Sequence, residues 1–171
     1  MGGYTIREGC IGCTVCAKRC PVEAITGSSR KMHYIDPALC IDCGVCGSYC
    51  PVDCIYDQFG QQTFMIRNAK LRPLVVVIEE NCTGCVACVD ICPFDCLEMK
   101  TGQEAGHFYE VATLTRPRAC VACKLCEVAC SDKDAIRVVW PDGSGKLELG
   151  GEPLRSFNEP PAPLAAAGGP R

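Results

Sequence analysis

The chain has 171 residues, a formal net charge of −3 and a pI near 5.4, a balance that excludes the clustered Lys and Arg of a nucleic-acid-binding protein. Its 18 cysteines are about a tenth of the sequence and its aromatic residues only 6%. So thin an organic core needs disulfides, metals or partners to fold. The longest apolar run, residues 74–78, is too short to cross a bilayer.

In chain order, the first expected element is a strand at residues 4–8, followed by a cysteine-rich loop, a short helix and a strand at 24–26. A turn of Gly, Ser and basic residues at 27–31 leads to the next strand, at 32–36. The same order of strand, cysteine loop, short helix and strand recurs along the chain. The sequence therefore predicts a series of small α+β modules.

The second half begins with an apolar, β-branched entry strand at residues 74–78 and closes with a strand at 135–140. From residue 143 the chain is rich in Pro, Gly and Ala and cannot form a core alone. We expect this tail to lie across a partner, with a merely disordered tail as the alternative.

One cysteine motif, C-x2-C-x2-C-x3-C, occurs four times and accounts for 16 of the 18 cysteines. Its copies are Cys10-Cys13-Cys16-Cys20, Cys40-Cys43-Cys46-Cys50, Cys82-Cys85-Cys88-Cys92 and Cys120-Cys123-Cys126-Cys130. Proline follows the fourth cysteine three times, at Pro21, Pro51 and Pro93, and Ser131 replaces it in the last copy. Three thiolates on one tight loop can cap three iron corners of a cubane, whereas structural zinc sites use two short-spaced ligands from each of two segments.

Cellular location bears on the same choice, because disulfides persist in oxidising compartments. The N-terminus shows no basic and apolar export signal and no twin-arginine pair, so we expect a cytoplasmic metalloprotein with metal-bound cysteines. Zinc and disulfides remain the alternatives to iron-sulfur chemistry.

Residues 4–142 resemble a duplicated bacterial two-[4Fe-4S] ferredoxin. The residues that carry the likeness are Cys-Ile-Gly-Cys-Thr-Val-Cys-Ala-Lys-Arg-Cys-Pro-Val-Glu-Ala-Ile at 10–25 and Cys-Ile-Asp-Cys-Gly-Val-Cys-Gly-Ser-Tyr-Cys-Pro-Val-Asp-Cys-Ile at 40–55, with two further copies. The resemblance implies an α+β fold of two tandem ferredoxin-like domains that bind four [4Fe-4S] clusters. The expected division is a first domain at 1–60, a linker at 61–73, a second domain at 74–142 and the tail at 143–171.

In two-cluster ferredoxins the fourth cysteine of each motif ligates the other cluster. The shortest gap between motifs, 19 residues, separates the first two, which favours tandem pairing over a nested pairing of motif one with four and two with three. Motifs two and three are each followed by one additional cysteine, Cys54 and Cys96, and this likeness points toward nesting. The tandem ligand sets are Cys10, Cys13, Cys16 and Cys50; Cys40, Cys43, Cys46 and Cys20; Cys82, Cys85, Cys88 and Cys130; and Cys120, Cys123, Cys126 and Cys92.

Two histidines, His33 and His107, could be ligands, but the cysteines already fill every cubane corner. Cys54 and Cys96 are expected to be packed free thiols, with reserve ligation as the alternative. In the last motif the proline is missing and the Ala-Ile pair comes one residue later, so the sequence does not decide the conformation of the turn there.

Fully ligated clusters leave no iron for a substrate, and the chain shows no phosphate loop, nucleophile elbow or flavin motif. We therefore expect a non-catalytic electron-transfer subunit. The resemblance is greatest to the small subunits of tungsten-dependent aldehyde oxidoreductases, which implies a larger tungsten or molybdenum catalytic partner and, at the other end, a flavin subunit or further copies of the chain. The alternatives are a freely diffusing polyferredoxin, an enzyme in its own right or a cluster-assembly scaffold.

Overall fold

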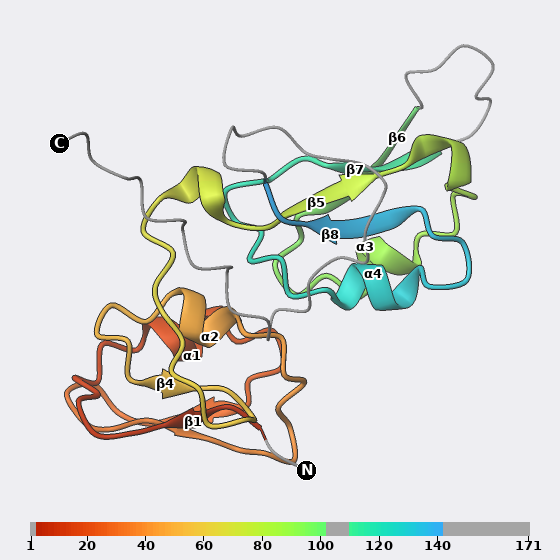
Figure 1. Ribbon diagram of the computed structural model, residues 1–171. Coiled ribbons are helices and arrows are strands. Elements are labelled where there is room, and N and C mark those ends of the chain that lie inside the picture. Colours follow the sequence, from red (N-terminus) through yellow and green to blue (C-terminus); the bar gives the residue numbers. More distant parts are fainter. Residues whose placement is uncertain (1–2, 102–109, 142–171) are drawn as a thin grey trace, which may run out of the picture.

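The computed structural model describes residues 3–101 and 110–141, which form two units of short strands and short helices (Figure 1). Helix and strand content is mixed, as the α+β expectation requires. The elements of the first unit are β1 (Thr5–Ile6), α1 (Val15–Arg19), β2 (Ile25–Thr26), β3 (Tyr34–Ile35), α2 (Val45–Ser48) and β4 (Ile55–Tyr56). Those that follow are η1 (Ala69–Leu71), β5 (Leu74–Val77), η2 (Glu79–Asn81), α3 (Ala87–Asp90), β6 (Leu97–Thr101), β7 (Glu110–Leu114), α4 (Leu125–Ala129) and β8 (Ile136–Val139).

Each unit contains two antiparallel strand pairs with the same connectivity. In the first unit β1 pairs with β4 and β2 with β3, and in the second β5 pairs with β8 and β6 with β7. The first and last strands of a unit thus close it, and the middle pair forms a hairpin. Helix α1 packs against α2, and α3 against α4. This arrangement makes the second unit a structural repeat of the first.

The expected strands are present but shorter. The strands expected at residues 4–8, 24–26 and 32–36 contain only two residues each, while the runs at 74–78 and 135–140 form β5 and β8. Strand β4 and the β6–β7 hairpin were not assigned from the sequence, because two residues show no alternation and residues 97–101 mix apolar and charged side chains.

The cysteine loops repeat one backbone geometry four times. The residues on both sides of each second cysteine have positive φ: Gly12 and Thr14, Asp42 and Gly44, Gly84 and Val86, and Ala122 and Lys124. A left-handed conformation costs a non-glycine residue about 1–2 kcal/mol, and Thr and Val are β-branched besides. Such strain persists only where the surroundings impose it.

The fourth motif forms a turn that is one residue longer. In the first three motifs, the residue three positions after the fourth cysteine has a left-handed backbone; these residues are Glu23, Asp53 and Asp95. In the last motif it is Asp134, whose amide donates to the carbonyl of Cys130 over 2.9 Å. The extra residue is absorbed before β8, so Ile136 still pairs with Val77.

The segment expected to be a linker, residues 61–73, begins with contacts to the first unit. The amide of Thr63 donates to the carbonyl of Ile55 over 2.9 Å, and the amide of Met65 donates to the Asp53 carboxylate over 2.7 Å. The side chain of Thr63 closes over Gly47 in α2, where an added Cβ would lie 2.6 Å from the Cβ of Thr63. Residues 61–66 therefore extend the first unit. The expected tail at 143–171 lies outside the described residues.

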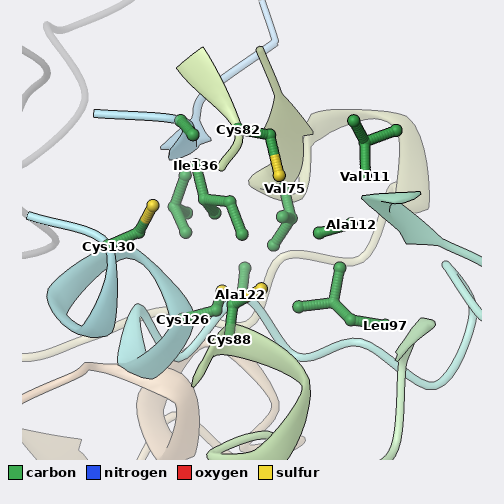
Figure 2. Close-up of a cluster of buried hydrophobic side chains, with 12 residues drawn as sticks. Val75, Cys82, Cys88, Leu97, Val111, Ala112, Ala122, Cys126, Cys130 and Ile136 are labelled. Carbon is green, nitrogen blue, oxygen red and sulfur yellow. The ribbon is translucent and has the colours of Figure 1, made fainter. Parts of the chain in front are cut away.

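The core of each unit is built partly from cysteine. In the second unit Cys82, Cys88, Cys126 and Cys130 are buried among aliphatic side chains of β5, β7 and β8, as Figure 2 shows. In the first unit Cys16, Cys46, Cys50 and Cys54 are buried beside Tyr4, Ile6 and Ile55. Within the described residues no helix is long and apolar enough to span a membrane.

The contact between Gly47 and Thr63 gives a test of the fold. Ala for Gly in a helix normally stabilises by about 0.5–1 kcal/mol. Here we expect Gly47→Ala to lower the unfolding free energy of the cluster-loaded protein by about 1–3 kcal/mol, because the new methyl group overpacks against Thr63. Thermal unfolding under anaerobic conditions measures the change.

The double variant Gly47→Ala/Thr63→Gly is the control, because it removes the obstructing side chain and should recover part of the loss. A melting temperature of Gly47→Ala at or above that of the parent would contradict the contact.

Candidate metal centres

Sixteen cysteines line four cavities, and each cavity takes three cysteines from one motif and the fourth cysteine of its neighbour. Cavity A contains Cys10, Cys13, Cys16 and Cys50; cavity B contains Cys40, Cys43, Cys46 and Cys20; cavity C contains Cys82, Cys85, Cys88 and Cys130; and cavity D contains Cys120, Cys123, Cys126 and Cys92. This grouping is the tandem one, with motif one beside two and motif three beside four. That these sulfurs bind clusters remains a prediction.

The exchange of fourth cysteines follows from the way the helices pack. In the first unit Cys16 lies within α1 and Cys20 caps its C-terminal end. Because α1 packs against α2, Cys20 reaches the cavity formed by the second loop and Cys50 reaches the cavity formed by the first. Helices α3 and α4 repeat the arrangement with Cys92 and Cys130.

The four cavities are alike in size and lining. Their empty volumes, solvent at the mouths included, are about 290 Å³ for A, 310 Å³ for B, 320 Å³ for C and 340 Å³ for D. Apart from the sulfurs, mainly apolar side chains line them. Among residues 3–101 and 110–141, no three His, Cys, Asp or Glu side chains converge on a point that could hold one metal ion. Four sulfurs spread around an apolar cavity suit a polynuclear cluster with one thiolate at each iron corner.

Burial makes most of these thiols hard to ionise on their own. Desolvation raises the pKa of Cys16 to about 11 and that of Cys43 to about 12, and it raises the pKa of Cys46 well above its ordinary value. The charges of neighbouring cysteines raise these pKa values further. A thiolate in such a place needs a cation, and iron bound in the cavity would supply it. The residues present therefore fit a [4Fe-4S] cluster.

Backbone amides point at several sulfurs. The amide of Ala24 donates to Cys20 Sγ over 3.3 Å, and the amide of Cys96 donates to Cys92 Sγ over the same distance. A hydrogen bond from the backbone of Ala87 lowers the pKa of Cys85, with the positive charge of Lys133 as a further cause. Hydrogen bonds to the sulfurs are one of the levers that set the potential of an iron-sulfur cluster.

The two additional cysteines lie at two of the cavities. Cys54 is 5% exposed, lines cavity A and has its Sγ 3.5 Å from that of Cys50. Cys96 is 1% exposed, lines cavity D and directs its Sγ to the carbonyl of Phe94 over 3.5 Å. Desolvation raises the pKa of both thiols to about 12. Both are thus buried beside a cavity whose four sulfurs come from the motifs.

The second cysteines of the motifs differ in exposure. Cys13 and Cys85 are exposed, whereas Cys43 and Cys123 are partly covered. Cys43 and Cys123 belong to different units, and yet the charge of Cys123 raises the pKa of Cys43. In Figure 1 the helices of each unit lie on the side that faces the other unit. Cavities B and D therefore lie at the junction of the units, and cavities A and C open to solvent at their second cysteine.

Of the two histidines considered from the sequence, His33 is buried and lines cavity A, and His107 lies outside the described residues. No sequence pattern indicates that His33 lies at the cavity of the first motif. The hairpin that carries it is short, and only the register of β2 with β3 brings position 33 to that cavity.

Two protein-family models match the chain, both described as a 4Fe-4S dicluster domain. One covers residues 5–56 and the other residues 32–93. The first spans motifs one and two, and the second overlaps it and spans motifs two and three. Together the two matches extend over residues 5–93.

Several curated relatives are named as one and the same subunit of an ion-translocating oxidoreductase complex. The protein from Azoarcus is 62% identical over 53 residues, which are 31% of this chain and 29% of the relative. The protein from Pasteurella multocida is 49% identical over 77 residues, 45% of this chain and 39% of the relative. The matches thus span 29% and 39% of the length of these two relatives.

Among solved structures, a chain of the formate dehydrogenase–heterodisulfide reductase–formylmethanofuran dehydrogenase complex from Methanospirillum hungatei matches with a TM-score of 0.41. The sequence identity is 21%, and the match covers 86% of this chain and 53% of that chain. A likeness of this size supports no argument about function.

The cavity lining predicts which buried cysteine near cavity A is a ligand. Cys54→Ala should retain about 16 iron per chain, because the four motif sulfurs remain, and Cys50→Ala/Cys54→Ala should retain about 12. Removing Cys54 from both proteins prevents it from replacing Cys50. Iron and acid-labile sulfide analysis of anaerobically reconstituted protein makes the comparison.

Cys96→Ala is the matched variant at cavity D and should also keep about 16 iron. Loss of a quarter of the iron from Cys54→Ala or Cys96→Ala would show that the motif cysteines are not the complete ligand set.

Proposed function

We propose that this chain, a protein with 4Fe-4S dicluster sequence over residues 5–93, carries four [4Fe-4S] clusters and transfers electrons as a non-catalytic subunit of an oxidoreductase complex. The observation that supports the proposal best is the set of four apolar cavities with four cysteine sulfurs each. When bound, a [4Fe-4S] cluster supplies reversible one-electron redox chemistry. The sulfurs of cavities A to D hold one cluster each.

The donor set favours electron transfer over catalysis. Each cavity offers one thiolate for each of the four irons, so no corner is left for a substrate. The cysteines instead hold the centre rigidly, on loops fixed by left-handed residues at both sides of the second cysteine. Apolar side chains around the buried sulfurs limit the access of water to the bound group.

The charge of the loaded protein favours low potentials. Each all-thiolate cluster adds about −2 in its oxidised state, so the formal net charge of −3 becomes about −11. Adding an electron to so anionic a body is costly, and all-cysteine ligation works in the same direction. We therefore expect clusters that dithionite reduces under anaerobic conditions.

The exposure of the second cysteines supports an order for the four sites. Cavities B and D are neighbours across the junction, where Cys43 lies within the electrostatic reach of Cys123. Cavities A and C present Cys13 and Cys85 to solvent. We propose that redox partners approach at these two exposed loops, so that the order of sites along the protein is A, B, D and C.

The name that the curated relatives share supports a place in a multisubunit complex. We propose a larger catalytic or redox subunit as the partner, and a flavin subunit or a further copy of the chain at the other end. A tungsten or molybdenum enzyme of the aldehyde oxidoreductase type remains a prediction from sequence resemblance alone. A freely diffusing polyferredoxin is the alternative.

Metal analysis tests the cofactor. Anaerobically prepared protein should contain about 16 iron and about 16 acid-labile sulfide per chain, and dithionite should bleach its visible absorption. Protein saturated with zinc and free of sulfide would contradict the assignment.

Co-purification tests the partner. We expect the untagged chain, isolated anaerobically from its source, to elute with a larger redox subunit, because the two exposed loops are useful only when a redox centre faces them. Tungsten and molybdenum analysis of that fraction decides between the proposed classes of partner. Elution as a free four-cluster protein that still exchanges electrons with soluble donors would favour the polyferredoxin.

A further inference from the structure

The side chain of His33 is buried at cavity A and only half satisfied. It is 2% exposed and lines the cavity with Cys10, Cys13, Cys16 and Cys50. Its Nδ1 lies 3.1 Å from the carbonyl oxygen of Lys31, whereas its Nε2 is buried without a hydrogen-bond partner among the described residues. An unsatisfied buried polar atom costs about 1–3 kcal/mol, so Nε2 would be stabilised by a partner that residues 3–101 and 110–141 do not provide.

The β2–β3 hairpin makes room for the ring. Ile25 pairs with Ile35 and Thr26 with Tyr34, so the next position opposite His33 is Gly27. The φ of Gly27 is +154°, and an added Cβ would lie 2.6 Å from Cγ of His33. Any side chain at position 27 would therefore collide with the imidazole. The absence of a side chain at Gly27 thus leaves the space that the imidazole of His33 occupies beside cavity A.

The second unit gives an internal comparison. Leu97 pairs with Leu114 as Ile25 pairs with Ile35, and two residues further along the hairpin Met99 pairs with Ala112. Met99 and Ala112 therefore occupy the positions of Gly27 and His33, and both line cavity C. The same backbone places a polar ring at one cavity and two apolar side chains at the other. The difference lies in chemistry and not in fold.

The hydrogen bonding of the ring determines what Nε2 can do. A carbonyl oxygen only accepts, so the proton on Nδ1 is donated to Lys31. The cavity already has one cysteine for each iron, which leaves no corner for Nε2 as a ligand. An N–H at Nε2 would be a donor aimed at a cavity without another acceptor for it among the described residues, and a cluster in cavity A, with a charge of about −2, would be that acceptor.

We propose that His33 donates a hydrogen bond from Nε2 to the [4Fe-4S] cluster of cavity A and so raises the reduction potential of that cluster. The inference rests on the proposed function, because it needs a cluster in cavity A. A charge-assisted donor stabilises the more negative, reduced cluster more than the oxidised one. At cavity C the matching hairpin positions, Met99 and Ala112, carry no side-chain donor, and the cation that lines that cavity is Lys133, which comes from a different element.

Redox titration of the full chain, followed by EPR at a fixed pH, tests the effect. In His33→Phe, which keeps a ring but has no N–H, one of the four potentials should fall while three stay unchanged and the iron content remains about 16. In His33→Gln, whose amide can donate, the same potential should fall less. Four unchanged potentials in a fully loaded His33→Phe protein would overturn the proposal.

A second measurement has its first readout in the parent protein. Pulsed EPR of the reduced parent protein, labelled with ¹⁵N only in histidine, should detect a ¹⁵N coupling to a cluster. The coupling should vanish in His33→Gln and persist in the control His107→Gln. Its absence from the parent, or its loss only in His107→Gln, would overturn the proposal. A chain without iron and sulfide would instead refute the proposed function, so the two failures are distinguishable.

Discussion

In the function proposed above, bonding of cysteine sulfurs to a cluster inside each cavity is the interaction on which the rest of the structure depends. The strands contain two to five residues and the helices four or five, and all four helices begin without a side-chain cap. Isolated elements of this length are marginal in water. Five non-glycine residues beside the second cysteines adopt left-handed backbone, which costs further free energy. Metal–thiolate bonds are strong enough to offset these costs.

The second unit repeats the backbone of the first, but the two differ in what surrounds the sulfurs. The first hairpin carries Gly27 and His33 at the paired positions where the second hairpin carries Met99 and Ala112. His33 lines cavity A, and Met99 and Ala112 line cavity C. Cys54 adds a thiol to cavity A, and Cys96 adds one to cavity D. A duplicated scaffold with unequal linings separates two requirements: the backbone fixes where the centres lie, while individual side chains adjust each of them. The four proposed clusters would thus differ in potential.

Much of the cysteine framework could be predicted from the sequence, because ligand spacing is a local property. The C-x2-C-x2-C-x3-C motif indicates a loop followed by a helix, whereas the sequence does not decide the turn after the fourth copy, which is one residue longer in the structure, with Asp134 in the left-handed conformation. Strand β4 was missed because its two residues become a strand only by pairing with the distant β1, and the β6–β7 hairpin was missed because residues 97–101 mix apolar and charged side chains. The contact of Thr63 with Gly47 depends on tertiary packing that no local pattern indicates. His33 was noted from the sequence, but its place at cavity A depends on hairpin register.

The most direct test of the central claim is amide hydrogen exchange of the full chain with and without its iron. With four clusters bound, the backbone amides of β5 to β8 and of the four helices should be protected. After anaerobic chelation of the iron, the account predicts that this protection is lost in both units, because no sufficient organic core remains. An iron-free chain that kept protected strands and unfolded cooperatively would contradict the account, since its fold would then depend on apolar packing alone.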